Sequence, residues 1–390
     1  MRQLIARVCE REDLSTYDPY DIWKTPYGLA IKKLFNRSRL AGIVPAALLT
    51  LFDVYGNNRF RLSYSRQEYP VVRAFAALSL LNLYRTGQKD EYLQLVKLHL
   101  DWLVANRSKN CVGYGWGLGF EHAVKAAVVY NKDTPFVTIT PYPLEAFVAY
   151  RSISGDDRYD SAIQGVLVFL DQDIKILKDT PRHLITSYGT SKDRIVVNAI
   201  SYTMYMYALL RLYVDSDRRQ DIDDKIGRLY QFVKDQQRSD GSWLYSPEGS
   251  SFIDCFHSCI VLKNIIKTNR LFELEDVRTV VDEGYKYICE NFLDRRYGLF
   301  RRFSLKNKPS LVKFDLYDNA EMLNLANLTG DEELVRDLSQ AIERSFLHDK
   351  DIYSQVDIFN KRYNKNMLRW AVMPYLYALS YMPEATGLSK

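Results

Sequence analysis

The sequence predicts an all-α fold in which about six helical hairpins close into an (α/α)6 toroid. Three observations support this prediction. Apolar residues recur mostly at intervals of three and four, strand patterns are scarce, and one polar turn recurs between helical segments. The first strongly periodic segment shows the helical spacing at Val71, Ala74, Phe75, Leu78 and Leu81. An open helical solenoid is the alternative arrangement of the same hairpins.

Composition indicates a globular chain with enough apolar material for a large core. The 390 residues are 47% hydrophobic and 26% charged, and the net charge of +5 is spread along the chain. No basic run suggests nucleic-acid binding. Five cysteines without regular spacing favour a reducing compartment. Because Met1–Asp21 lacks an apolar signal core and runs such as Val72–Leu83 are too short to cross a bilayer, we predict a soluble, cytoplasmic protein without a transmembrane segment.

A weak internal repeat defines the hairpins. Copies of a short polar turn, each followed by an amphipathic segment, lie roughly 55–70 residues apart, longer than the periods of common solenoids. The copies are Leu83–Asp90, Tyr150–Asp157, Leu212–Asp217 and Ala326–Asp331, with a degenerate one at Thr268–Leu271. No linker or low-complexity segment interrupts the pattern, so one domain over residues 1–390 is expected.

The more apolar helix of each hairpin is expected to line the inside of the ring. The inner candidates are Val71–Leu83, Pro143–Tyr150, Asn198–Tyr213, His257–Ile266, Asp318–Leu325 and Leu368–Ser380. An irregular stretch rich in aromatic and polar residues precedes nearly every one of them. These loops would gather at one mouth of a central funnel, where functional residues are expected.

The first such loop, Cys111–His122, alternates glycine with aromatic residues and cannot form a stable helix. It lacks the Lys-Ser/Thr ending of a phosphate loop. The loop would let its backbone approach a ligand while Trp116 offers a ring face. Glu121 and His122 could serve as acid and base, or form a solvent-facing pair.

The next two loops contribute a carboxylate and three polar side chains. Prolines fix an extended entry into an inner helix that carries Glu145 in its first turn, where it would act in catalysis or stabilise the helix dipole. Tyr188 precedes the following inner helix, and Asn198 and Tyr202 open it. Helix capping is the alternative role of Asn198.

The fourth loop carries the strongest motif. Asp240 opens an Asp-Gly-Ser-Trp turn that we expect to project the indole of Trp243, and Tyr245 follows it. Asp254 and His257 are three residues apart, so they share one face of a helix. A carboxylate beside an imidazole sets its tautomer and pKa for proton transfer, although a buried structural pair is the alternative.

Two cysteines flank this histidine without forming a zinc site. Cys255, His257 and Cys259 occupy alternate positions of one helix, so His257 points away from the two cysteines. All three could not ligate one ion, and we expect neither a metal nor a cofactor.

The last two loops add acidic and basic groups. Asp315, Asp318 and Glu321 step by three at the start of an inner helix, as a general base, a cation site or helix-capping acids would. Arg369 and Trp370 precede the final apolar segment, where they would bind an anionic sugar or form a structural ion pair.

Taken in order, these motifs resemble a family of helical-toroid proteins encoded in bacterial and archaeal polysaccharide-biosynthesis clusters, the VpsJ-like polysaccharide biosynthesis proteins. The resemblance extends from about Val71 to Tyr381. It depends on Gly115–Gly117, the Thr-Pro-Phe-Val segment at Thr134, Asn198, Asp240, Ile253–His257, Asp315 and Arg369–Trp370. The first loop departs from the family, because it reads Gly-Leu-Gly-Phe-Glu-His where the family has Gly-Tyr-Pro/Asn-Phe-Asp-Trp.

The resemblance implies a pathway better than a reaction. Its architecture is similar to that of N-acylglucosamine 2-epimerases, glucuronyl C5-epimerases and several glycoside hydrolases and lyases. Partners would be an oligo- or polysaccharide, or a nucleotide- or lipid-linked sugar, and other proteins of such a cluster. A non-catalytic polysaccharide-binding factor and an isoprenoid enzyme of the terpene cyclase or prenyltransferase kind are the alternatives.

The sequence thus favours a carbohydrate-active protein, with a hydrolase, lyase or epimerase as the expected enzyme. The residues predicted to act in catalysis are Asp254, His257, Asp315 and Glu145. The residues predicted to bind substrate are Trp116, Glu121, His122, Tyr188, Asn198, Tyr202, Asp240, Trp243, Tyr245, Asp318, Arg369 and Trp370. For a hydrolase, two carboxylates would face each other roughly 6.5–9.5 Å apart. For a lyase or epimerase acting on uronates, His257 with Tyr188 or Tyr245 would exchange a proton, and Arg369 would neutralise the carboxylate.

Overall fold

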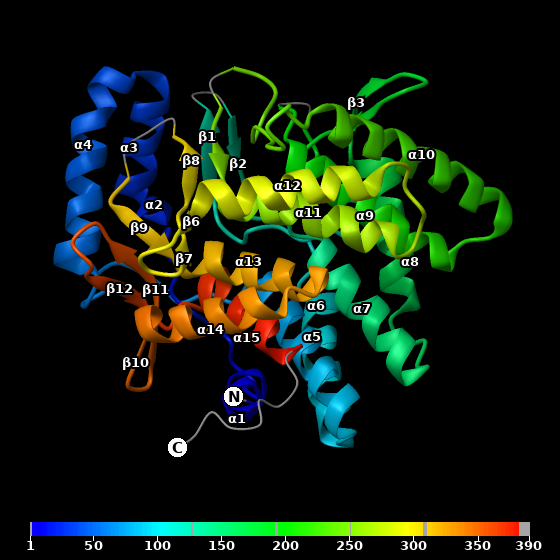
Figure 1. Cartoon of the computed structure of the whole chain (residues 1–390), viewed down its shortest axis with the longest axis horizontal. Coiled ribbons are helices and arrows are strands. Elements are labelled where there is room, and N and C mark those ends of the chain that lie inside the picture. Colours follow the sequence, from blue (N-terminus) through cyan, green and yellow to red (C-terminus); the bar gives the residue numbers. More distant parts are fainter. Residues whose placement is uncertain (1, 126–127, 192–193, 250, 307–309, 382–390) are drawn as a thin grey trace.

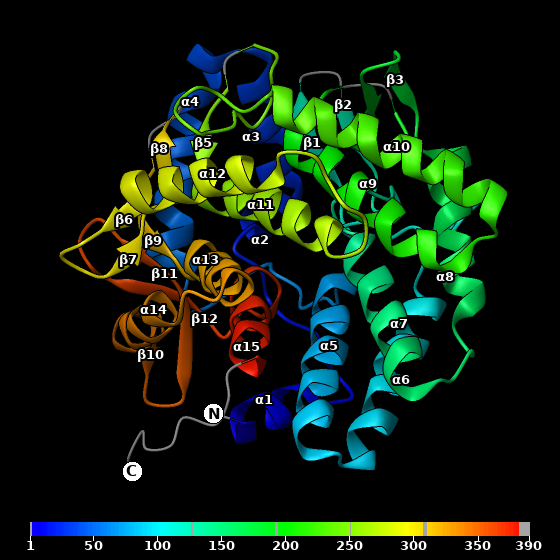
Figure 2. The same ribbon diagram turned by 45° about the vertical axis from the view of Figure 1, so that its right-hand side comes forward.

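Six helices form a closed inner ring. The computed structural model describes residues 2–125, 128–191, 194–249, 251–306 and 310–381. Each inner helix packs on the next, and the last packs on the first, so the ring closes (Figures 1 and 2). The inner helices are α5 (Pro70–Gly87), α7 (Pro141–Ser154), α9 (Val197–Leu210), α11 (Cys255–Asn269), α13 (Leu316–Thr329) and α15 (Met373–Ser380). The toroid is confirmed, and the open solenoid is excluded.

An outer layer of helices covers the ring. Each of five outer helices follows an inner helix in the chain and packs against it, whereas α1 comes from the N-terminal segment and packs on both α5 and α15. The outer helices are α1 (Arg2–Cys9), α6 (Asp90–Ala105), α8 (Asp160–Val168), α10 (Ser216–Asp235), α12 (Val277–Phe292) and α14 (Glu332–Phe346). Short π-helical or 3-10 segments follow some helices or precede them: Phe52–Asn57, Phe169–Asp173, Arg211–Tyr213 and Leu368–Val372.

Burial explains which helix takes which layer. Every residue of α9 is buried, whereas α14 alternates buried and charged positions and buries one face only. The predicted polar turns end inner helices and lead into outer ones. Gly155 and Gly330 end α7 and α13 in the left-handed conformation, with φ angles of 72° and 73°. The expected inner segments all fall on inner helices, with the last one beginning in the π-helical turn before α15.

Two buried tryptophans each anchor a loop to an outer helix through a hydrogen bond from the indole N–H to a backbone carbonyl. Trp116 is fully buried, and its Nε1–H donates to the carbonyl oxygen of Leu103 in α6 at 2.8 Å. Trp243 is 3% exposed and donates to the carbonyl oxygen of Val233 in α10 at 2.9 Å. Each acceptor is the third residue from the end of its helix. The Asp-Gly-Ser-Trp turn is present, with Gly241 at a φ of 86°, but it buries its indole rather than projecting it.

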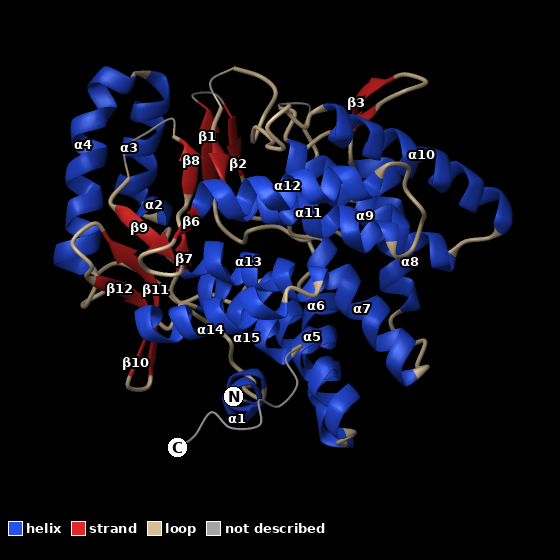
Figure 3. Ribbon diagram, in the orientation of Figure 1, coloured by secondary structure: helices blue, strands red, loops and turns tan. Residues whose placement is uncertain are grey.

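Short antiparallel strands, which the helical periodicity does not predict, occupy the loops before the inner helices (Figure 3). The paired strands are β1 (His122–Lys125) with β2 (Val128–Tyr130), β3 (Ile176–Asp179) with β4 (Leu184–Thr186), β5 (Ile253–Asp254) with β8 (Phe303–Leu305), and β6 (Leu293–Asp294) with β7 (Leu299–Phe300). The four-stranded sheet joins β9 (Val312–Asp315), β10 (Leu347–His348), β11 (Asp351–Asp357) and β12 (Arg362–Lys365). Because β5 runs into α11 and β9 into α13, these strands position Asp254 and Asp315 at strand–helix junctions.

A helical hairpin lies beside the ring. It comprises α2 (Asp21–Lys24), α3 (Pro26–Arg37) and α4 (Arg39–Leu51), drawn in blue at the edge of Figure 1. Within the described chain, Arg39–Asn57 is long and apolar enough to cross a membrane by length and composition, with a mean hydropathy of 1.4 in its most apolar window and 28% of that window buried. Val72–Leu83, the apolar run discussed in the sequence analysis, lies in α5 and is buried.

Candidate functional site

Asp254 and His257 form a dyad at the start of α11. The Asp254 carboxylate caps the helix by accepting the backbone N–H of His257 at 3.2 Å. Its two oxygens also lie 2.8 and 2.9 Å from Nδ1 of His257, so Nδ1 carries a proton and donates it. Asp254 is 3% exposed, whereas the side chain of His257 is 20% exposed. The dyad therefore holds the imidazole in one tautomer and leaves Nε2 as the ring atom for a ligand.

A small hollow opens beside this dyad. Its cavity volume is about 10 Å³, room for about one water molecule, so it is a shallow depression and not a formed ligand pocket. Its lining consists of Val197, Asn198, Trp243, Leu244, Tyr245, Asp254, His257, Ser258 and Val261. The central funnel expected from the sequence is therefore nearly closed beside the dyad.

Asn198 contributes an unsatisfied acceptor to the hollow. The side chain is 4% exposed, and its Oδ1 has no hydrogen-bond partner within the described ranges. The capping role is wrong, because α9 begins after Val196 and no side chain caps it. A buried amide oxygen without a partner costs about 1–3 kcal/mol. A ligand hydroxyl donating to Oδ1 would remove this cost.

Aromatic and cationic side chains extend from the dyad around the mouth of the ring. We name this set the aromatic rim; its members are Phe120, His122, Tyr188, Arg194, Tyr245, Phe256, His257, Tyr317, Arg369 and Trp370. On one side of His257, the ring of Tyr245 lies 4.7 Å away. Arg194 contacts the hydroxyl of Tyr245 at 3.4 Å and lies over the ring of Tyr188 at 4.0 Å. The structure thus brings Tyr188 and Tyr245 to the same side of the dyad.

The rim continues on the other side of His257 through ring contacts. Phe256 packs on Tyr317 at 5.0 Å, and Tyr317 packs on Trp370 at 5.0 Å. Arg369 then lies over Trp370 at 4.8 Å and over Phe120 at 5.1 Å. These contacts bring together side chains from the loop before α7, the first turns of α11 and α13, and the π-helical segment before α15.

Positive charge gathers where the two ends of the rim approach each other. His122 lies 6.3 Å from Phe120, and Nζ of Lys32 lies 3.4 Å from its Nδ1. Burial lowers the pKa of His122 to about 3, and the charges of Lys32, Arg194 and Arg369 lower it further in the same direction. His122 is therefore a neutral imidazole at physiological pH, in a positive environment.

Arg369 is not available to a ligand in the way the sequence suggested. It is 2% exposed, and its Nε lies 2.5 Å from the carboxylate of Asp18, which is fully buried. It would have to break this ion pair to neutralise a substrate carboxylate. Its guanidinium instead supports the rings of Trp370 and Phe120.

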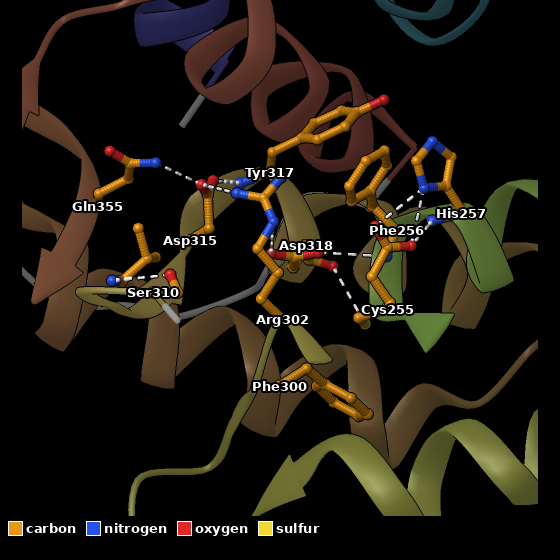
Figure 4. A network of polar contacts seen from close by, with 12 residues as sticks. Cys255, Phe256, His257, Phe300, Arg302, Ser310, Asp315, Tyr317, Asp318 and Gln355 are labelled. Atoms are coloured by element: carbon orange, nitrogen blue, oxygen red, sulfur yellow. Dashed lines mark hydrogen bonds and ion pairs between the residues drawn. The ribbon is translucent and has the colours of Figure 1, made fainter. Parts of the chain in front are cut away.

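Arg302 organises the acidic group at the start of α13 (Figure 4). Its Nη1 lies 2.8 Å from Asp315, and its Nε lies 3.9 Å from Asp318. Burial alone would lower the pKa of Arg302, but the charges of Asp318 and Asp315 outweigh burial and raise it. Burial raises the pKa of Asp318, and Arg302 only partly offsets it. Figure 4 shows Phe256 between this group and His257.

The predicted carboxylates have structural partners. Asp315 caps α13 by accepting the backbone N–H of Tyr317 at 2.9 Å, and it also accepts from Nε2 of Gln355 at 2.8 Å. Oδ1 of Asp318 accepts from the backbone N–H of Phe256 at 3.2 Å. Asp315 and Asp318 therefore lie beside the dyad, tied to it through Arg302 and the first turn of α11.

Glu145, in α7, lies away from the dyad and pairs with a lysine of α11. Both of its oxygens contact Nζ of Lys267, at 2.7 and 2.9 Å. Lys267 stands near the end of α11, about 20 Å along the helix axis from Asp254 at its start. Glu145 is therefore inside the ring, too far from Asp254 to act with it on one bond.

The remaining predicted residues lie in the core or away from the dyad. Trp116 and Trp243 are the buried fasteners described above, although one edge of Trp243 reaches the hollow. Tyr202 is buried inside the ring, where its hydroxyl meets that of Tyr142 at 2.5 Å. Asp240 accepts from Ser242 within its own turn, and the exposed Glu121 pairs with Lys33 at 3.3 Å.

Sequence reasoning missed Arg302, Gln355, Arg194 and Asp18. Arg302 lies in the bend between β7 and β8, Gln355 lies in β11, and neither segment carries a distinctive pattern. Asp18 contacts Arg369 across 351 positions of the chain. The one available signal was the adjacency of Arg302 to aromatic residues before the acidic motif at Asp315.

Comparisons with known proteins agree on the architecture. No protein-family model matches the sequence, and no curated protein matches it. Solved structures do match. A cellobiose 2-epimerase from Bacillus thermoamylovorans B4167 has a TM-score of 0.61 at 12% identity, covering 80% of this chain and 86% of that one. A D-mannose isomerase has a TM-score of 0.59 at 10% identity, covering 80% and 87%. A family 76 glycoside hydrolase from a bovine Bacteroides thetaiotaomicron strain has a TM-score of 0.56 at 14% identity, covering 84% and 71%.

These likenesses agree with the architecture described above: the chain is an (α/α)6 toroid. At such low identity they show the fold and not a shared reaction. The resemblance to VpsJ-like proteins stays a prediction.

Proposed function

We propose that the protein is a carbohydrate-active enzyme that moves a proton on a sugar, as an epimerase, isomerase or lyase does. The observation that carries the proposal is the dyad, in which buried Asp254 fixes the tautomer of half-buried His257 beside a hollow whose lining includes Asn198. Structural neighbours that include a cellobiose 2-epimerase and a D-mannose isomerase support this class.

In the proposed reaction, Nε2 of His257 removes a proton from a carbon next to a carbonyl or carboxylate group of the sugar. Asp254 holds Nδ1–H and stabilises the imidazolium that forms. Tyr245 or Tyr188 returns a proton to the opposite face in an epimerase, and Arg194 contacts both. A lyase would instead lose the substituent on the next carbon.

Hydrolysis by two carboxylates is the weaker alternative within the same class. Glu145 pairs with Lys267, which is about 20 Å from Asp254 along α11, and Asp315 is held by Arg302 and Gln355. An acidic glycan fits the rim better than a neutral one, because Lys32 and Arg194 place positive charge beside His122, whereas the charge of Arg369 is paired with Asp18. The substrate would be an oligo- or polysaccharide, or a nucleotide- or lipid-linked sugar, of a surface polysaccharide pathway.

The first experiment is a binding screen followed by isotope exchange. Thermal stability is measured with acidic and neutral oligosaccharides, nucleotide sugars and prenyl diphosphates, where a ligand at about 100 times its Kd adds about 2.7 kcal/mol. Each stabilising sugar is then incubated in D₂O and examined by NMR. We expect deuterium at one ring carbon with the wild type and none with H257Q. Stabilisation by prenyl diphosphates alone, or turnover without deuterium incorporation, contradicts the proposal.

A non-catalytic glycan-binding protein is the second candidate, and the small size of the hollow favours it. At about 10 Å³ the hollow cannot enclose a reacting bond of a glycan without movement of the rim. A binder would be stabilised by a sugar, show no exchange in D₂O, and bind that sugar equally well after D315N, a variant that keeps the cap geometry.

A further inference from the structure

The outer face of the α3–α4 hairpin is apolar and uncovered. Leu40 is 91% exposed, Val44 61% and Leu48 62%, and their spacing of four places them along one side of α4. We name this surface the α4 face; its members are Leu40, Ile43, Val44, Leu48, Leu51 and Phe52, all exposed. Exposed Phe60 and Leu62 follow in the next loop. Contiguous apolar surface of this kind marks an interaction site.

The segment that carries the α4 face is rich in basic residues, although Lys24 and Lys33 are paired with Asp21 and Glu121. Residues 22–66 contain eight basic residues and one acidic residue, Asp53, which is buried and accepts the hydroxyl of Tyr64 at 2.5 Å. The basic residues are Lys24, Lys32, Lys33, Arg37, Arg39, Arg59, Arg61 and Arg66. None lies between Leu40 and Asn58, so arginines stand at both ends of an uncharged helix face.

The basic residues at both ends of the α4 face favour an anionic membrane over a second copy of the chain as its binding partner. A second copy of the chain packed antiparallel on the α4 face would place Arg37 and Arg39 against Arg59 and Arg61, and like charges would repel. A bilayer with anionic headgroups offers apolar chains to the leucines and negative charge to the arginines at once.

The hairpin is held in place along its inner side. Gly42 packs so closely on α3 that a Cβ there would meet the backbone of Phe35 at 2.3 Å. Tyr55 donates to Asp357 at 2.9 Å and thereby ties the end of the hairpin to the four-stranded sheet. A helix fixed on one side presents its other side and does not cross the bilayer.

We propose that the α4 face lies in the headgroup–acyl boundary of an anionic membrane and docks the protein there. The inference is independent of the proposed reaction, because it rests on the outer side of the hairpin. The inner side of the same hairpin reaches the aromatic rim through Lys32 and Nδ1 of His122 at 3.4 Å. Docking would thus hold the rim beside the membrane.

The test is cosedimentation of the purified full chain with vesicles. The vesicles consist of phosphatidylcholine alone, or of phosphatidylcholine with about one phosphatidylglycerol in three lipids. We expect binding to the anionic vesicles that weakens with added salt. The triple variant L40S/V44S/L48S should bind at least tenfold more weakly, since each change removes an exposed apolar side chain. The matched control, L98S/V112S/L212S, changes three exposed apolar residues elsewhere and should bind as the wild type does.

Three outcomes overturn the proposal. Wild-type protein that stays in the supernatant with anionic vesicles refutes it, and so does equal binding by L40S/V44S/L48S. A dimer in light scattering that this variant abolishes, without vesicle binding, assigns the α4 face to a second copy. Thermal melting of both triple variants establishes that they are folded, so a loss of binding reflects the surface itself.

Discussion

The rim and the interior of the ring use the same chemistry to different ends. Inside the ring, Lys263 pairs with Glu321, which is fully buried, and Lys267 contacts both oxygens of Glu145. At the rim, the Asp254–His257 dyad leaves Nε2 facing a hollow, and Oδ1 of Asn198 lacks a partner within the described chain. The interior pairs neutralise each other, whereas the rim pair keeps bonding capacity. That difference, more than the presence of charge, locates a ligand site.

The largest effect should come from the rim. H257Q keeps a polar side chain of similar length but cannot take up a proton at neutral pH. We expect turnover of the sugar identified by the binding screen to fall by about 10²–10⁴-fold, the range of general acid–base catalysis. The measurement is the initial rate with the purified variant. If the free energy of unfolding of H257Q stays close to that of the wild type, the loss of rate reflects catalysis and not folding. An unchanged rate would show that His257 has a structural role.

The interior should respond in stability instead. K263M leaves the carboxylate of Glu321 buried without its partner, which should lower the free energy of unfolding by about 3–5 kcal/mol in urea denaturation. The double variant K263M/E321Q removes both charges and should recover most of the loss. If K263M is as stable as the wild type, the Lys263–Glu321 pair does not stabilise the fold, and the contrast between the interior and the rim does not hold.

A buried histidine sharpens the contrast with His257. His99 is fully buried, and its Nε2–H donates to the carbonyl oxygen of Cys9 at 2.7 Å. Burial, with the charge of Arg73, lowers its pKa to about 4. Between about pH 6.5 and pH 4 the unfolded chain binds a proton that the folded chain does not. The free energy of unfolding should therefore fall by about 3 kcal/mol as pH drops through this window.

Denaturation at pH 7 and at pH 4.5 measures that slope. H99Q should lose part of it, because its side chain does not titrate. H348Q changes an exposed histidine and should keep the wild-type slope. Equal slopes in all three proteins would assign the acid sensitivity to other groups, namely His122, whose pKa burial also lowers, and the carboxylates.

The smallest effect should come from Asn198. N198A removes the unsatisfied Oδ1, so binding of the sugar should weaken by about tenfold, the value of one neutral hydrogen bond, while the protein gains or keeps stability. Isothermal titration calorimetry gives the affinity. N198A that binds as the wild type does, but melts at a lower temperature, would make Asn198 a structural residue.

Helical periodicity predicted the ring well, because each hairpin buries its own pattern of apolar residues. The spacing of Asp254 and His257 predicted the dyad for the same reason, since both lie in one turn. Contacts between distant segments were not predictable. Arg302 contacts Asp315 from the bend between β7 and β8, and Glu145 in α7 pairs with Lys267 in α11. Trp116 and Trp243 were expected at the surface, but an indole can equally fasten a loop from inside.

The closing contact of the ring has a consequence for how the protein is made. Helix α15 packs on α5, and Asn82 donates to Ser380 at 2.8 Å across 298 positions of the chain. Ribosomes add about 5–20 residues per second, so α5 waits roughly 15–60 s after its synthesis before α15 emerges. During that interval the apolar side of α5 that α15 will cover stays open to other chains. The nascent protein should therefore depend on a chaperone until the last inner helix leaves the ribosome.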